Sequence, residues 1–304
     1  MEIIKLNKNS ICKIEDCAIA IGYFDGLHLG HMQLLNKVID ICQSTHLKKG
    51  FMTFDQHPKV VFGQSDFQSL MSLEEKQKIV EKLDFDYFFI IEFDKEVAKY
   101  QPAEFIDQYI VKNNIKYIVC GFDFSFGDKG KGTVETLKLL AQNRYDVDVI
   151  EKYEIDHKKV SSSLIRNFIH KGEIEKANQL LNRPYRITGR VIHGRKNGHK
   201  IGFPTANIEV GNYAILKRGV YAVYINVYGK RYKGMANIGV NPTFGSLDKI
   251  SLEVHIFEFD LEIYDEIVDV DFIAHTRDES HFHSIDALVE QLNKDMEYID
   301  QILD

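Results

Sequence analysis

The 304-residue sequence lacks the features that mark secreted and membrane-spanning proteins. Its four cysteines, Cys12, Cys17, Cys42 and Cys120, form neither a C-x-x-C pair nor a spacing typical of zinc ligands. The first residues carry mixed charges and no long apolar core, so no signal peptide is predicted. No apolar run approaches the ~18 residues needed to span a bilayer. These absences predict reduced thiols in a cytoplasmic protein that has no membrane partner.

An excess of positive charge is also missing. The formal net charge is −7 at pH 7, so overall electrostatics give no attraction to nucleic acid or to anionic lipid. The hydrophobic content of 44% and the aromatic content of 12% are typical of globular proteins. A chain of this length can form two domains. No nucleic-acid partner is expected, and any phosphate binding must come from local groups.

Strand-like and helix-like segments alternate through the first part of the chain. Several short segments are apolar throughout, as expected for strands covered on both faces: 18–21, 51–54, 87–91, 117–120 and 147–150. Helical patterns lie between them, for example at 74–83 and 102–113, and a last helical region covers 162–181. This order predicts an α/β, Rossmann-like domain with a parallel sheet over residues 1–182.

The pattern changes around Asn182, Arg183 and Pro184. Glycines then punctuate short β-rich segments, which predict an antiparallel barrel or sandwich over residues 183–304: 187–192, 220–227, 232–238, 252–257 and 268–272. A C-terminal helix follows, with Ser284 as its N-cap. One face of that helix is apolar: Leu288, Leu292, Met296, Ile299 and Leu303.

The most informative motif follows the first apolar segment and precedes a helical pattern. It contains Gly22, Phe24, Asp25, Gly26, His28, Gly30 and His31. The glycines allow the backbone to approach a ligand, and the helix start offers N–H groups to an anion. His28 and His31 can donate hydrogen bonds to a phosphate. Two surface histidines or a metal pair are the alternatives. The motif resembles the H-x-G-H signature of nucleotidyltransferases, and its strand–turn–helix context favours that interpretation.

Two further loops of the first domain follow predicted strands and should border the same crevice. The first contains Phe54 and His57. The second contains Asp123, which can reach a ribose hydroxyl or a base, and Phe124, which can flank an aromatic ring. A surface histidine and a solvated aspartate are the alternatives. The glycine-containing stretch 128–133 has no Gly-Lys-Ser/Thr, so it is not a P-loop.

A run of serines opens the last helical region of the first domain. Ser161, Ser162 and Ser163 can act as caps. Arg166 falls in the first turn, where a cation is unfavourable unless an anion lies nearby. This mismatch predicts a contact with the triphosphate of ATP.

The second domain carries oxygen ligands and a carboxylate. Its basic loop ends in a string that contains Gly202, Pro204, Thr205 and Asn207. Thr205 and Asn207 offer oxygen donors suited to Mg²⁺ bound to ATP, although a local turn would use the same residues. Glu253 lies on an alternating strand and can act as general base for a primary alcohol; an outward-facing charged residue is the alternative. Arg277, before the last helix, can close over a flat ligand.

Together and in this order, the motifs resemble the bacterial bifunctional riboflavin kinase/FAD synthetase family. The histidine motif, 121–124 and 161–166 match its FMN adenylyltransferase module, while 202–207, 239–243 and Glu253 match its riboflavin kinase module. The resemblance implies that ATP phosphorylates riboflavin to FMN, leaving ADP, and that a second ATP adenylylates FMN to FAD with release of pyrophosphate. It also implies that Glu253 is the base and that Thr205 and Asn207 hold Mg–ATP. His28, His31 and Arg166 would stabilise charge on the transferring phosphates.

The sequence departs from the family pattern at a few positions. Ser125 stands where the family commonly has arginine, Ser163 where threonine is usual, and Asp265 where glycine is common. One alternative is therefore a riboflavin kinase whose adenylyltransferase domain is weakened or inactive, and another is a flavin-binding regulator without turnover. The intact functional residues favour the bifunctional enzyme: His28, His31, Thr205, Asn207 and Glu253.

Overall fold

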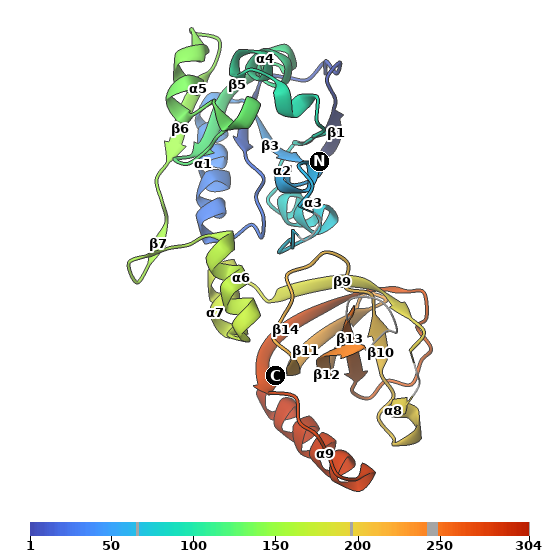
Figure 1. Cartoon of the computed structure of the whole chain (residues 1–304). Helices are drawn as coiled ribbons and strands as arrows, with labels where there is room; N and C mark the ends of the chain where they lie inside the picture. The colour runs from blue at the N-terminus through green and yellow to red at the C-terminus, as the bar shows by residue number, and fades with distance from the viewer. Residues whose placement is uncertain (65–66, 195–196, 242–248, 304) are drawn as a thin grey trace. The chain divides into compact units, whose positions relative to one another are not determined.

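A computed structural model describes residues 1–64, 67–194, 197–241 and 249–303. The chain forms two compact units, an α/β unit and a barrel unit (Figure 1). The α/β unit comprises Met1–Phe67 and Ser72–Ser161, and the barrel unit comprises Gln68–Met71 and Ser162–Asp304. Compactness thus groups residues 162–182 with the barrel, whereas the division by function between residues 182 and 183 stays a prediction.

Within its described residues, the α/β unit contains one six-stranded sheet in the order β1-β4-β3-β2-β5-β6. All of its strand pairs are parallel. The strands are β1 (Glu2–Leu6), β2 (Cys17–Ile21), β3 (Lys48–Phe54), β4 (Tyr87–Ile91), β5 (Ile115–Gly121) and β6 (Asp146–Ile150). The predicted parallel sheet is confirmed. The sequence reasoning missed β1, because an edge strand with exposed residues on one face lacks a continuous apolar run.

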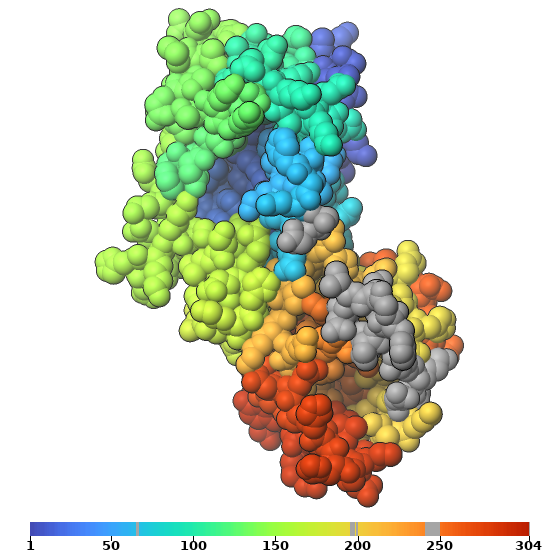
Figure 2. Space-filling view, viewed as in Figure 1, coloured from blue at the N-terminus to red at the C-terminus, as the bar shows by residue number. Residues whose placement is uncertain are grey.

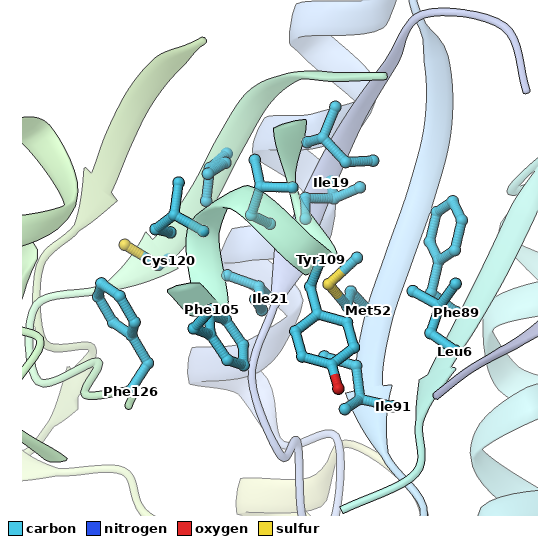
Figure 3. Close-up of a cluster of buried hydrophobic side chains, with 14 of the residues drawn as sticks. Leu6, Ile19, Ile21, Met52, Phe89, Ile91, Phe105, Tyr109, Cys120 and Phe126 are labelled. Carbon is cyan, nitrogen blue, oxygen red and sulfur yellow. The ribbon is translucent and has the colours of Figure 1, made fainter. Parts of the chain in front are cut away.

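Helices connect these strands and cover the sheet, so β2 and β4 are buried along their whole length. The helices are α1 (Leu29–Thr45), α2 (Pro58–Val61), α3 (Leu73–Lys82), α4 (Pro102–Tyr109) and α5 (Val134–Ala141). Short 3₁₀ turns cover Val97–Lys99, Val111–Asn113 and Asp128–Gly130. Figure 3 shows part of the core on one face, where strand residues such as Ile21 and Met52 pack with Phe105 and Tyr109 of α4.

The strand order creates a crevice beside β2. From β2 the chain runs through β3 and β4 on one side of the sheet and then returns to β5 on the other side. Loops that leave the carboxyl ends of strands at such a switch point diverge and leave room for a ligand. Figure 2 shows that the visible face of this unit is hollowed between its light-blue and green segments. The hairpin of β7 (Glu154–Ile155) and β8 (Lys158–Lys159) ends the unit.

The barrel unit begins its main stretch with α6 (Ser162–Lys171) and α7 (Ile174–Leu181), two helices where one helical region was predicted. Gly172, with φ +76°, breaks the region. The side chain of Asn178 ties α7 to the barrel, because its Nδ2 donates to the Phe272 carbonyl (2.8 Å) and its Oδ1 accepts from the Tyr185 N–H (2.7 Å). These bonds explain why the helices group with the barrel.

The remaining strands close into an antiparallel barrel in the order β10-β13-β12-β11-β14-β9, which decides between the barrel and the sandwich. They are β9 (Tyr185–Ile192), β10 (Ala206–Ile208), β11 (Gly219–Val227), β12 (Lys230–Asn241), β13 (Lys249–Ile256) and β14 (Ile267–Arg277). The helices of this part are α8 (Asn197–Lys200) and α9 (Ile285–Ile302). Ser284 caps α9 as predicted, by accepting from the Ala287 N–H at 3.1 Å. Among the described residues, no helix is long and apolar enough to cross a membrane.

Candidate active sites

The backbone after β2 makes an unusual turn. Phe24, Gly26 and Leu27 all have positive φ, at 55°, 84° and 40°. This region is unfavourable for residues other than glycine, and such strain persists only where the surrounding structure enforces it. Phe24 is buried, and its ring centroid lies 4.6 Å from that of Phe51. The turn therefore has a defined shape that leads directly into α1.

The two motif histidines contact each other at the start of α1. His28 is the N-cap, and its Nδ1 accepts from the backbone N–H of His31 at 3.3 Å. In the neutral ring this bond places the proton of His28 on Nε2. The two rings stack, with centroids 3.6 Å apart. A Cβ on Gly30 would lie only 3.2 Å from the His28 ring, so glycine leaves room for this geometry.

The loop after β3 joins the histidine turn through aromatic contacts. His57 caps α2, since its Nδ1 accepts from the Lys59 N–H at 3.1 Å. Its ring stacks on Phe67 (3.9 Å) and meets the edge of Tyr23 (4.5 Å). Phe54 instead contacts Phe93. The predicted proximity of His57 to the motif loop is thus present, whereas its contact with a substrate stays a prediction.

The loop after β5 carries an exposed ion pair. The Asp123 carboxylate lies 2.6 Å from the Lys159 ammonium, which also lies over the Phe122 ring. Phe124 stacks on Phe126 and is packed against the core. Asp123 is therefore accessible to a ligand, while Phe124 presents only part of its ring.

The predicted triphosphate contacts are divided between the two units. Ser161 ends the α/β unit, whereas Ser162, Ser163 and Arg166 belong to α6 of the barrel unit. Arg166 Nε donates to the carbonyl of Gln68 at 2.8 Å. Its role toward ATP stays a prediction.

The motifs that resemble riboflavin kinase meet on the outer face of the barrel. Asn207 of β10 and Asn237 of β12 lie opposite Glu253 of β13 on its two sides. Opposite residues in antiparallel strands share a face. Thr205 Oγ1 donates to Glu253 Oε2 at 3.3 Å. The alternation predicted for this strand is confirmed, because Leu252, Val254 and Ile256 are buried on the other face.

The loop before β10 is held by contacts that the sequence reasoning missed. His255 Nδ1 donates to the Pro204 carbonyl at 2.8 Å. A Cβ on Gly194 would lie 2.3 Å from Asn207 Nδ2, so the chain at Gly194 runs against that amide. Gly202 has φ +84°, a conformation that favours glycine. The signal for His255 was available, since it shares the alternating face of Glu253.

Arg277 forms an ion pair with Asp295 of α9. Its Nη2 lies 2.7 Å from Oδ2 of the buried Asp295, which also accepts from Gln291 Nε2 (2.8 Å). This pair connects the end of β14 to α9. A contact of Arg277 with a ligand stays a prediction. Pro242 and Thr243, which belong to the matching segment 239–243, lie outside the described residues.

Two family models match the chain. One, described as FAD synthetase, matches residues 11–164 and so contains the histidine turn and the loops after β3 and β5. The other, described as riboflavin kinase, matches residues 181–303 and so contains the Thr205–Glu253 site.

Curated relatives match both halves together. A bifunctional riboflavin kinase/FMN adenylyltransferase of Listeria monocytogenes is 40% identical over 91% of this chain and 89% of its own length. The same-named protein of Bacillus subtilis is 39% identical over the same shares. A solved structure from Streptococcus pneumoniae, described as a macrolide-efflux protein, is 32% identical, with a TM-score of 0.89 and 98% of each chain covered. The matches of both halves place the chain in the bifunctional riboflavin kinase/FMN adenylyltransferase family.

Proposed function

We propose how this bifunctional riboflavin kinase and FMN adenylyltransferase uses its residues. Riboflavin phosphorylation is assigned to the Thr205–Asn207–Glu253 site, and adenylyl transfer to the histidine turn. The assignment rests on one observation: each of the two matched family regions contains a different set of reactive side chains. A carboxylate lies among hydroxyl and amide groups on the barrel, and stacked imidazoles lie at a helix N-terminus in the α/β unit.

In the kinase step, the 5′-hydroxyl oxygen of riboflavin attacks the γ-phosphorus of ATP while Glu253 accepts the hydroxyl proton. The bond to ADP breaks, and FMN forms. Because Thr205 donates its proton to Glu253, the lone pairs of its oxygen remain available to a cation. Thr205 and Asn207 would hold Mg²⁺, for which hard oxygen donors are suited. The bound ion would neutralise charge on the ATP phosphates.

In the adenylyl-transfer step, a phosphate oxygen of FMN attacks the α-phosphorus of ATP, and the bond to pyrophosphate breaks. His28 and His31 donate hydrogen bonds to the phosphate oxygens on which negative charge develops. The N-terminus of α1 adds its dipole. No covalent bond to the protein is needed. Asp123, His57, the serines Ser161–Ser163 and Arg166 are assigned to binding of the nucleotide and flavin.

We also place the enzyme in the cytoplasm. All four cysteines are free thiols, as expected for a reducing compartment. Burial raises the pKa of the Cys42 thiol to about 11, so this group stays protonated and unreactive at neutral pH. No nucleic-acid or membrane partner is part of the proposal.

The products made from riboflavin test the two activities together. We expect the purified chain, incubated with riboflavin, ATP and Mg²⁺, to accumulate FMN first and FAD later, as separated by chromatography. Chelation of Mg²⁺ should abolish both products if the ion accompanies both ATP molecules. FMN as the only product would favour a weakened adenylyltransferase, and unchanged riboflavin would contradict the assigned kinase activity.

Replacing Ser125 by arginine should increase adenylyl transfer. Ser125 is exposed on the loop after β5, and nearby lysines are engaged, Lys131 with Asp128 and Lys159 with Asp123. An arginine would add a positive charge that can orient a phosphate. We expect several-fold faster FAD formation from FMN, the scale of one solvent-exposed charge interaction, and unchanged FMN formation. Ser125→Gln is the uncharged control; an equal effect of both substitutions, or none, would contradict a role for charge here.

A further inference from the structure

Lys76 of α3 is a buried cation beside the histidine turn. Its side chain is 4% exposed, although lysine is almost never buried without partners. Its Nζ donates to the Tyr23 carbonyl at 2.6 Å and to Thr53 Oγ1 at 3.2 Å. The ammonium also lies 4.7 Å from the centroid of the Tyr23 ring. Lys76 therefore links α3 to the end of β3 and to the residue that precedes the strained turn.

The bonds around Lys76 converge on one acceptor. The Tyr23 carbonyl accepts from both Lys76 Nζ and Thr53 Oγ1, the latter at 3.0 Å. The next residue, Phe24, is the first in the turn with positive φ. Fixing the Tyr23 carbonyl fixes the orientation of the peptide from which the turn starts. The position of His28 as N-cap depends on where that turn ends.

The charge of Lys76 also has a counterpart in the turn. Burial lowers the pKa of Lys76 to about 8, and the Asp25 carboxylate opposes this decrease. Asp25 itself is only 5% exposed. A buried cation near a buried anion costs desolvation, which partner bonds must offset. Buried opposite charges with this desolvation cost, next to a strained backbone, are typical of functional sites.

We propose that Lys76 is a positioning residue for adenylyl transfer, which holds the Tyr23 carbonyl and thereby fixes the histidine turn and the aim of His28 and His31. The proposal rests on the assignment of that turn to adenylyl transfer. Lys76 is buried and its ammonium is bonded to Tyr23 and Thr53. It therefore acts through the turn rather than on the substrate. Displacement of catalytic groups by about 1 Å can lower a rate on the order of 10²-fold.

The first test replaces Lys76 by methionine, which retains the apolar stem and removes the charge and both donated bonds. We expect kcat for FMN-to-FAD conversion to fall about 10- to 100-fold, while KM for ATP changes little, because alignment is lost rather than uniform binding. Riboflavin phosphorylation by the same chain should be unchanged. Lys78→Met is the matched control, since Lys78 is exposed on the same helix.

A second pair of variants tests the positioning role even if Lys76→Met folds poorly. Thr53→Val removes the hydroxyl at almost constant shape, and Thr53→Ser keeps it. Thr53→Val loses both the bond donated to the Tyr23 carbonyl and the bond accepted from Lys76. We expect it to lower kcat for adenylyl transfer at least about threefold to tenfold, the scale of one such bond, and Thr53→Ser to restore it. A merely structural role predicts a lower melting temperature with wild-type kcat in both Lys76→Met and Thr53→Val, and that result would overturn the proposal.

The histidine variant separates this proposal from the assignment of the site. Loss of adenylyl transfer in His31→Ala, with wild-type kcat in Lys76→Met and Thr53→Val, would overturn the positioning role and leave the site in place. Wild-type adenylyl transfer in a folded His31→Ala would overturn the site assignment, and the positioning role with it. Loss in His31→Ala, Lys76→Met and Thr53→Val, with rescue in Thr53→Ser, is the expected result.

Discussion

Replacing Glu253 by glutamine is expected to lower riboflavin phosphorylation roughly 10²–10⁴-fold, the usual contribution of a general base. The glutamine amide has nearly the same size and retains an oxygen that can accept from Thr205 Oγ1. It cannot accept the substrate proton. The loss should therefore appear in kcat, measured as FMN formed at saturating riboflavin and Mg–ATP, while the affinity for ATP changes little.

Two controls make this result specific. Conversion of supplied FMN to FAD should remain at the wild-type rate in Glu253→Gln, because that reaction is assigned to other residues. Glu209→Gln, at an exposed position next to β10, should leave both reactions unchanged. Wild-type FMN formation by Glu253→Gln would show that Glu253 is only a polar residue of the barrel surface.

Replacing His31 by alanine is expected to slow FAD formation from FMN by ~10²-fold or more, the scale of removing one preorganised donor. The substitution also removes the ring that stacks on His28 and contacts the edge of Phe24, so His28 would lose a support as well. The measurement is single-turnover FAD formation with supplied FMN, ATP and Mg²⁺.

Riboflavin phosphorylation in the same His31→Ala preparation reports whether the barrel unit is intact. Asn36→Ala is a matched control, because Asn36 is exposed on α1 and alanine favours the helix. We expect wild-type rates of both reactions in that control. A folded His31→Ala that forms FAD normally would remove the histidine pair from the mechanism.

The sequence predicts the parts of this protein that depend on local pattern. Continuous apolar segments indicated the buried strands, alternation placed Glu253 opposite the apolar face of β13, and Ser284 capped α9 as expected. Each of these features follows from neighbours in the chain. The positions of the loops after β2, β3 and β5 at one edge of the sheet follow from the parallel order.

The features that the sequence reasoning missed depend on partners distant in the chain. Lys76 has a helical sequence context and acquires its bonds only from Tyr23 and Thr53. Asn178 joins α7 to the barrel through the backbone at Tyr185 and Phe272. Tertiary pairing of this kind leaves no periodic trace in one sequence, because any exposed lysine or asparagine would look the same.

The segment Gln68–Met71 has a consequence for how the chain can be divided. It interrupts the α/β unit and joins the barrel unit, where the Ser69 N–H donates to the Asn212 carbonyl and the Ala214 N–H donates to that of Ser69. Leu70 and Met71 are only 2% and 4% exposed there. The chain thus passes between the units at more than one point. After a single proteolytic cut behind Ser161, the N-terminal fragment would still contact the barrel unit through Gln68–Met71. If that fragment were isolated, the side chains of Leu70 and Met71 would be exposed to water.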